Sequence, residues 1–287
     1  MLTLPEVIAA VPALSGTASF RSLSNGPTSN TWLLNLPDSG AVVRIDKPLA
    51  RLLCLDRERE LGVLEKVAHA GFGPEVMWAD PLRGVLITRY IPGEHLDLSH
   101  AVAPANICRL ALRVRELHDT PMAVPVIEVA ETASRYASVT HTVQTKEILS
   151  QVAILLKRLR TDLTKYSLCH NDLGSRNIID AAAIRFIDWE YSAACNPCFE
   201  LAGVVRQNNL SVGNVRLLLR SYFGTADKEL ERRFSLFSRL YDLVSALWYL
   251  AVCAADERDL LNRRLLLRTL VRLRQSSGSL PRRVKIN

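Results

Sequence analysis

Long uncharged apolar runs are missing from this sequence of 287 residues. None approaches the roughly 18 to 20 residues that a membrane-spanning helix requires, so we expect a soluble protein without a membrane span. The first residues also lack the basic stretch and apolar core of a secretory signal. We therefore expect a cytoplasmic protein.

Cysteine is scarce and scattered. The six cysteines stand in apolar contexts without regular spacing: Cys54, Cys108, Cys169, Cys195, Cys198 and Cys253. Cys195 and Cys198 have the spacing of half a zinc or redox site, but no second pair accompanies them. The pattern favours a reducing compartment over a disulfide framework.

Aromatic residues make up only 6% of the chain, while Lys and Arg outnumber Asp and Glu by 36 to 29, a net charge of +7. Such a balance suits a nucleotide, a nucleic acid or an anionic membrane. Near the C-terminus the basic residues have no aromatic residues between them, so we expect a solvated helix face and tail rather than nucleic-acid binding. These residues are Arg263, Arg264, Arg268, Arg272, Arg274, Arg282, Arg283 and Lys285.

The N-terminal third has the pattern of a small β-rich lobe. Apolar runs between residues 20 and 45 are separated by turn sequences and predict a three-strand meander. Residues 56–70 have a helical period and end at Gly71 and Gly73, and residues 84–90 predict another strand. We expect these elements to form one lobe over residues 1–91.

The remaining sequence, residues 92–287, is mostly helical in pattern. A polar loop between two short apolar runs interrupts it at residues 167–194, and the last dozen residues resemble a loose tail. We expect a second, helical lobe that carries this loop. The predicted helices span residues 104–118, 145–164, 213–223, 229–255 and 257–274.

The polar loop contains the pattern H-x-D-x-x-x-x-N, from His170 to Asn177, and Asp188 follows at the end of the next apolar run. Phosphoryl transfer to an alcohol requires a carboxylate that accepts the hydroxyl proton and oxygen ligands for Mg²⁺. Asp172 is the predicted catalytic base, and Asn177 and Asp188 are the predicted Mg²⁺ ligands. The alternative is that all three make ordinary turn and capping hydrogen bonds.

At these residues the chain resembles the aminoglycoside phosphotransferase and choline kinase superfamily. The resemblance extends over most of the chain and implies an α+β, protein-kinase-like fold with a small β-rich N-terminal lobe and a larger helical lobe. It also implies a small-molecule kinase that uses ATP and Mg²⁺. Among the branches, the chain looks most like bacterial choline and ethanolamine kinases and nearly as much like thiamine kinase.

The resemblance also implies a nucleotide site. Arg44 matches the basic strand residue that contacts the phosphates, and Glu60 matches its helical ion-pair partner. The loop that would cover the phosphates lacks G-x-G-x-x-G; its candidate residues are Ser24, Asn25, Gly26 and Thr28. Adenine is expected beside the strand that ends at Thr88 and Tyr90. Without the resemblance these residues would be ordinary surface charges and turns.

The acceptor remains open. Glu190, Tyr191 and Trp248 are candidate substrate contacts, because an acidic or aromatic side chain attracts a cationic amino alcohol. Ser245 stands where a second tryptophan of choline kinases is expected, and Trp248 could be a core residue instead. Choline and ethanolamine are the favoured acceptors, and thiamine, an aminoglycoside and an amino sugar are the alternatives.

A catalytically inactive nucleotide-binding protein is the non-enzyme alternative, and nucleic acid is not expected as a partner. The oligomeric state, the preference for ATP over GTP and the role of the basic C-terminal region stay open.

Overall fold

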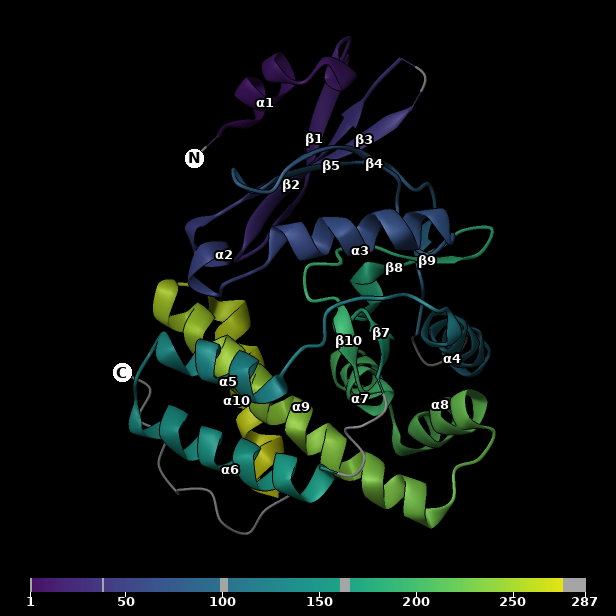
Figure 1. Ribbon diagram of the computed structural model, residues 1–287, viewed down its shortest axis with the longest axis vertical. Helices are drawn as coiled ribbons and strands as arrows, with labels where there is room; N and C mark the ends of the chain where they lie inside the picture. Colours follow the sequence, from purple (N-terminus) through teal and green to yellow (C-terminus); the bar gives the residue numbers. More distant parts are fainter. Residues whose placement is uncertain (1, 38, 99–102, 161–165, 276–287) are drawn as a thin grey trace. The chain divides into compact units, whose positions relative to one another are not determined.

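The computed structural model describes residues 2–37, 39–98, 103–160 and 166–275 (Figure 1). They belong to two compact units, which we describe separately. The first comprises residues 1–126 and 165–227, and the second 127–164 and 228–287. The lobe boundary expected at residue 91 falls inside the first unit and stays a prediction. The basic tail beyond residue 275 lies outside the described residues.

The N-terminal part of the first unit contains an antiparallel five-stranded sheet with the strand order β1-β2-β3-β5-β4 (Figure 1). Its strands are β1 (Ser19–Asn25), β2 (Ser29–Asn35), β3 (Gly40–Asp46), β4 (Val76–Asp80) and β5 (Val85–Arg89). The predicted meander is confirmed by the pairing of β1 with β2 and of β2 with β3. Strand β4 was not predicted, because it is half-buried along its whole length and shows no alternation.

One face of this sheet forms a small core with a short helix at the start of the chain. Helix α1 (Leu4–Ala10) and a 3₁₀ turn (Pro12–Leu14) bring Val7 and Leu14 against the sheet residues Val43 and Ile87, all of them buried. Sequence patterns did not predict α1, since seven residues are too few to show a helical period.

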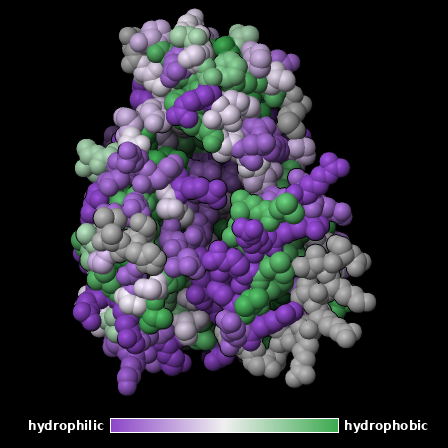
Figure 2. All heavy atoms as spheres, turned by 180° about the vertical axis from the view of Figure 1, so that it is seen from behind, coloured by the Kyte–Doolittle hydropathy of each residue, from purple (hydrophilic) through white to green (hydrophobic). Residues whose placement is uncertain are grey.

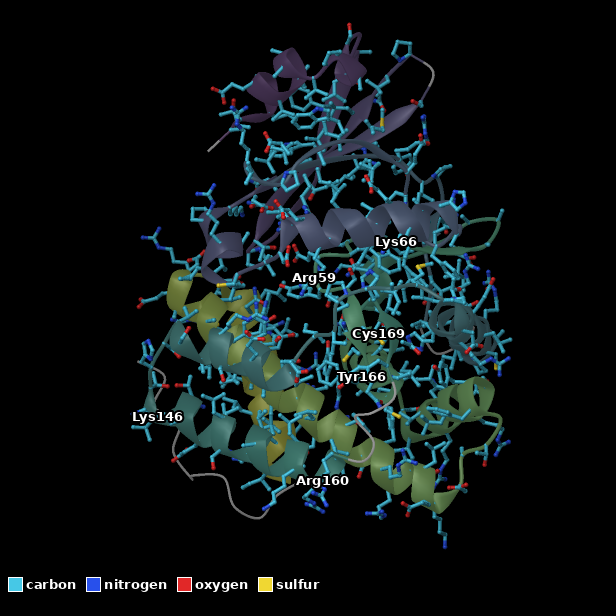
Figure 3. The ribbon with its side chains drawn as sticks, viewed as in Figure 1. Arg59, Lys66, Lys146, Arg160, Tyr166 and Cys169 are labelled. Carbon is cyan, nitrogen blue, oxygen red and sulfur yellow. The ribbon has the colours of Figure 1, made fainter. Side chains whose placement is uncertain are left out.

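Helices α2 (Pro48–Leu52) and α3 (Arg57–His69) follow β3. Asp56 caps α3 by accepting a hydrogen bond from the Arg59 backbone N–H, and Gly71 stops it with a left-handed φ of 76°. Lys66, labelled on α3 in Figure 3, donates to the carbonyl oxygen of Ala123 at 2.6 Å. This bond ties α3 to the segment that follows α4.

The rest of the first unit surrounds the polar loop. Helix α4 (Ala103–Asp119) packs against α8 (Val212–Phe223), and α7 (Pro197–Gln207) packs against β7 (Ser167–Cys169). The other elements are β6 (Glu94–His95), a 3₁₀ turn (Ser175–Asn177), β8 (Ile178–Asp180), β9 (Ile184–Phe186) and β10 (Ala193–Cys195). The two predicted strands around the loop exist, but β7 pairs with β10 while β9 pairs with β8. The loop therefore connects two small sheets.

The second unit is helical. It consists of α5 (Val129–Ser138), α6 (Val143–Leu159), α9 (Lys228–Ala255) and α10 (Leu260–Gln275), and α9 contacts the other three. Helix α9 is long and apolar enough to span a membrane by composition, but 56% of the residues in the relevant window are buried. Its packing is that of a core helix. Helix α10 starts three residues later than predicted, because Asp259 caps it by accepting from the Asn262 N–H.

On the face in Figure 2, hydrophilic side chains are interspersed with separate apolar patches. Large apolar side chains that are more than 70% exposed include Leu82, Val143, Val212 and Leu260. They come from different elements, as expected for scattered surface residues. The sheet at the N-terminal end and the mainly helical remainder confirm the predicted α+β class.

Candidate active site

A buried ion pair joins strand β3 to helix α3. Arg44 Nη1 and Nη2 donate to Glu60 Oε1 and Oε2 at 2.5 and 2.6 Å. Burial raises the pKa of Glu60, but Arg44 and Arg57 together bring it below its usual value. Burial also lowers the pKa of Arg44, but Glu60 and the nearby carboxylates Asp188 and Glu190 together bring it well above its usual value. The pair thus holds a permanent positive charge on β3.

Backbone hydrogen bonds hold the polar loop after β7 in place. The N–H groups of His170 and Asn171 both donate to Glu200 Oε1 of α7, at 2.7 and 2.9 Å. Asn171 adopts a left-handed φ of 65°, and its side-chain amide donates to the carbonyl oxygen of Tyr191 at 3.0 Å. His170 Nε2 lies 2.9 Å from the carbonyl oxygen of Ile187, which agrees with a supporting role for this ring.

Two side chains orient the carboxylate of Asp172. Asn177 Nδ2 donates to Asp172 Oδ2 at 2.8 Å, and Gln207 Nε2 donates to Oδ1 at 2.6 Å. Burial and the charge of Asp188 raise the pKa of Asp172 to about 7 in spite of these donors. Because Asn177 uses its amide nitrogen for Asp172, its amide oxygen is the atom suited to a cation.

Asp188 brings a second carboxylate to the same place. Its backbone has a left-handed φ of 66°, and its side chain is 41% exposed. Asp188 Oδ1 lies 3.3 Å from Arg44 Nη1. The charge of Asp188 also contributes, after burial, to the raised pKa of Glu190. A divalent cation would relieve this concentration of negative charge, so Asp188 and Asn177 fit the hard oxygen ligands that Mg²⁺ prefers.

Glu190 and the loop between β1 and β2 complete the region. Glu190 is 5% exposed and accepts from Thr28 Oγ1 at 3.4 Å and from Arg57 Nη1 at 3.0 Å. Lys47 closes the loop, since its Nζ donates to Asn25 Oδ1 and, at 2.6 Å, to the carbonyl oxygen of Gly26. Ser24 lies on β1 just before this loop.

The remaining predicted residues are Thr88, Tyr90 and Trp248. Thr88 is a buried residue of β5, and the backbone N–H of Tyr90 donates to the carbonyl oxygen of Gly40 at 2.8 Å. Trp248 lies on α9, with its ring edge-to-face to Tyr249 at 5.2 Å. It belongs to the second unit and is not placed relative to Asp172.

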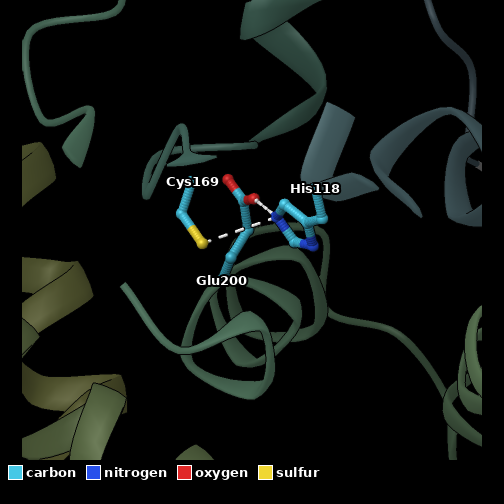
Figure 4. Close-up of side chains that lie close together, drawn as sticks. All are labelled: His118, Cys169 and Glu200. Carbon is cyan, nitrogen blue, oxygen red and sulfur yellow. Dashed lines mark hydrogen bonds and ion pairs between the residues drawn. The ribbon is translucent and has the colours of Figure 1, made fainter. Parts of the chain in front are cut away.

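Behind the loop, His118, Cys169 and Glu200 form a buried cluster (Figure 4). His118 Nε2 lies 2.5 Å from Glu200 Oε2 and 3.5 Å from Cys169 Sγ, and Nδ1 lies 2.6 Å from the Tyr222 hydroxyl. Two ligands of one zinc ion would stand about 3.4 Å apart. The short His118–Glu200 contact is therefore a hydrogen bond, and the cluster fixes Glu200 beneath the loop.

The structure thus brings together most residues singled out in the sequence. Arg44 joins Glu60 and Asp188, and Asn177 joins Asp172, all in the first unit. Sequence patterns did not predict two residues that contact these groups, Arg57 and Gln207. They also did not predict the roles of Glu200 and His118, which support the loop from behind. All four become visible only through contacts between distant segments.

Comparison with known proteins gives a family. The model of a family described as choline/ethanolamine kinase matches residues 28–206, more than half of the chain. Protein LicA of Haemophilus influenzae is 25% identical over 249 residues, which cover 81% of this chain and 72% of that protein.

Solved structures show the fold. Choline kinase LicA from Streptococcus pneumoniae superposes with a TM-score of 0.79 at 18% identity, over 94% of this chain and 98% of that one. A structure of LicA in complex with AMP superposes with a TM-score of 0.75 at 18% identity, over 95% and 97% of the two chains. The predicted kinase-like fold is confirmed.

Proposed function

Because the chain belongs to the choline/ethanolamine kinase family, we propose that it transfers the terminal phosphoryl group of ATP to the hydroxyl group of a choline-like or ethanolamine-like amino alcohol. The family identifies the protein as a phosphotransferase with a small-molecule alcohol as acceptor. One observation supports the chemistry most: hydrogen bonds from Asn177 and Gln207 orient the two oxygens of the Asp172 carboxylate.

Asp172 is the proposed catalytic base. Its two oxygens accept from separate amide donors, so the carboxylate cannot rotate freely and presents a fixed edge to the acceptor hydroxyl. A pKa of about 7 makes it a better proton acceptor than an ordinary aspartate. Once the hydroxyl oxygen bonds to phosphorus, its proton passes to Asp172 and the leaving oxygen remains on ADP.

Asn177 and Asp188 would hold Mg²⁺, through an amide oxygen and an exposed carboxylate. When bound, the ion neutralises phosphate charge. Arg44 would add a fixed cation for the phosphate oxygens, since Glu60 keeps its guanidinium in place. Ser24, Asn25, Gly26 and Thr28 would cover the phosphates with backbone and hydroxyl donors.

For the nucleotide, Thr88 and Tyr90 at the end of β5 would border adenine. The AMP complex of LicA, a protein of the same fold, supports a nucleotide in this kind of site. Nucleotide binding alone would also suit an inactive relative. The oriented base at Asp172 favours an enzyme.

For the acceptor, the choline kinase identity of the Streptococcus pneumoniae relative supports a cationic amino alcohol. Tyr191 and Trp248 remain the proposed aromatic contacts. Glu190 is a weaker candidate, because its oxygens already meet Thr28 and Arg57. Thiamine, an aminoglycoside and an amino sugar are the alternatives in the same chemistry. A soluble, cytoplasmic protein remains our expectation.

The test is ADP release from Mg-ATP with choline, ethanolamine, thiamine, an aminoglycoside and an amino sugar as acceptors. Asp172→Asn should lower kcat by about 100- to 10,000-fold for the true acceptor while nucleotide binding persists. Asp80→Asn, on strand β4, is the matched control and should behave as wild type. Nucleotide binding without turnover of any acceptor would favour the inactive-relative alternative.

A further inference from the structure

We infer that Arg57 is a positioning residue for the metal site, an inference that rests on the proposed function. Arg57 is the first residue of α3, and its side chain is 8% exposed. It touches neither Asp172 nor Asn177 among the contacts of the described residues. Its guanidinium instead contacts three carboxylates from three separate segments: Asp46, Glu60 and Glu190.

The contacts use both ends of the guanidinium. Towards Asp46, Nε donates to Oδ2 at 2.8 Å and Nη2 donates to Oδ1 at 2.7 Å, a two-point contact. Towards the other side, Nη1 donates to Glu60 Oε2 at 2.8 Å and to Glu190 Oε2 at 3.0 Å. A flat fork with this many donors can hold three partners at once, whereas a lysine ammonium cannot match the two-point contact.

A positive charge at this buried position costs free energy. Burial lowers the pKa of Arg57, the nearby Arg44 lowers it further, and only the carboxylates bring it above the usual value. The first turn of a helix also disfavours positive charge. Apolar residues packed in place of a buried charge cluster are often as stabilising or more so. Stability alone is therefore a poor explanation for Arg57.

Each carboxylate that Arg57 holds adjoins a residue of the proposed chemistry. Asp46 follows Arg44 by two positions on β3, Glu60 is the ion-pair partner of Arg44, and Glu190 follows Asp188 by two positions. The segment around Asp188 is irregular, with a left-handed φ at that residue. Arg57 thereby fixes the spacing between the cation on β3 and the metal-binding carboxylate after β9.

The experiment measures metal binding rather than turnover. Mn²⁺ serves as a paramagnetic probe, titrated in the presence of ADP and followed by electron paramagnetic resonance. In Arg57→Gln the Mn²⁺ affinity should fall by about 10- to 100-fold, the range typical of residues that orient metal ligands. The affinity for ADP without metal should change less than about twofold, because Arg57 is not a phosphate contact.

Arg57→Lys and Arg51→Gln are the companion variants. Arg57→Lys keeps the charge but loses the two-point contact, so we expect an intermediate loss of Mn²⁺ affinity. Arg51→Gln removes an exposed arginine side chain of α2 that donates to the carbonyl oxygen of Leu82 at 3.3 Å, and this variant should bind Mn²⁺ as wild type. Circular dichroism confirms that each variant is folded.

Wild-type Mn²⁺ affinity in a folded Arg57→Gln protein would overturn the inference; if that variant does not fold, wild-type affinity in Arg57→Lys would do the same. An equal loss of Mn²⁺ and metal-free ADP affinity would also overturn it, since that result indicates general damage. Failure of the proposed function would give a different result. The wild-type protein would bind no Mn²⁺ in the presence of ADP, or it would transfer no phosphoryl group although the Arg57 variants still show reduced Mn²⁺ affinity.

Discussion

The two compact units use buried charge differently. In the first, arginines join segments that lie far apart in the chain, as in the contacts of Arg44 with Asp188 and of Arg57 with Glu190. In the second, Arg272 contacts the buried Asp242 across two consecutive helices, α10 and α9. The proposed catalytic residues Asp172, Asn177 and Asp188 all belong to the first unit, whereas the proposed acceptor contact Trp248 belongs to the second.

The largest effect should come from the carboxylate that faces the metal. Asp188→Ala removes a proposed Mg²⁺ ligand and the negative partner of Arg44, so kcat should fall by about 1,000-fold. Steady-state ADP release at saturating Mg-ATP measures it. Addition of EDTA should abolish wild-type turnover and excess Mg²⁺ restore it; a variant with ordinary kcat would remove Asp188 from the metal site.

A matched pair of variants tests the contrast between the units directly. Glu60→Gln and Arg272→Met each break a buried ion pair, which typically costs about 3 to 5 kcal/mol of stability. Chemical denaturation should show a loss in both. Only Glu60→Gln should also lower kcat/KM for ATP, by about 10- to 100-fold, because Arg44 loses its partner. Equal kinetic losses in the two variants would contradict the division of roles.

The cluster in Figure 4 predicts a moderate effect. Glu200→Gln keeps the shape of the side chain but weakens its bonds to the backbone N–H groups of His170 and Asn171 and to His118. We expect kcat to fall by about 10-fold, with KM for ATP nearly unchanged, because the loop holds Asp172 less firmly. Addition of Zn²⁺ should restore nothing. Restoration by zinc would mean that the cluster is a metal site.

The smallest effect is expected in the second unit. Trp248→Ala should raise KM for a cationic acceptor by about 2- to 10-fold, the range of a single cation–π contact, and leave KM for ATP unchanged. Initial rates with the acceptor varied at fixed ATP measure this. Trp248→Phe is the matched control and should retain most of the affinity. A loss of stability with unchanged KM would make Trp248 a core residue.

The sequence predicted local structure well where a pattern repeats. The meander from β1 to β3 was predicted because turn sequences separate its apolar runs, and the helices α3, α4, α6, α8 and α9 were predicted because a helical period persists over enough residues. Residues 161–164, the end of one predicted helix, lie outside the described residues. The prediction failed for α1, which is short, and for α7, which is nearly uniformly buried. It also omitted α5, although the buried residues Val129, Ala133 and Tyr136 follow a helical spacing.

The sequence also predicted the proposed catalytic loop, because Asp172, Asn177 and Asp188 stand at distances that a short loop and one strand can bridge. It could not identify Arg57, whose neighbours in sequence resemble any charged first turn of a helix. Its partner Glu190 lies 133 positions away. No spacing rule connects such residues, since their proximity depends on how α3 packs near the segment after β9.

By itself, the sequence determined the fold class and the kinase family resemblance, and it predicted the oxygen donors, because these depend on residue types within short segments. Tertiary structure alone decided which charges meet. It placed Arg57 among three carboxylates, brought Glu190 within hydrogen-bond distance of Thr28 and Arg57, and brought Gln207 within hydrogen-bond distance of Asp172. The physical reason is that hydrogen bonds and ion pairs depend on distances of a few ångströms, which only the packing of distant segments determines.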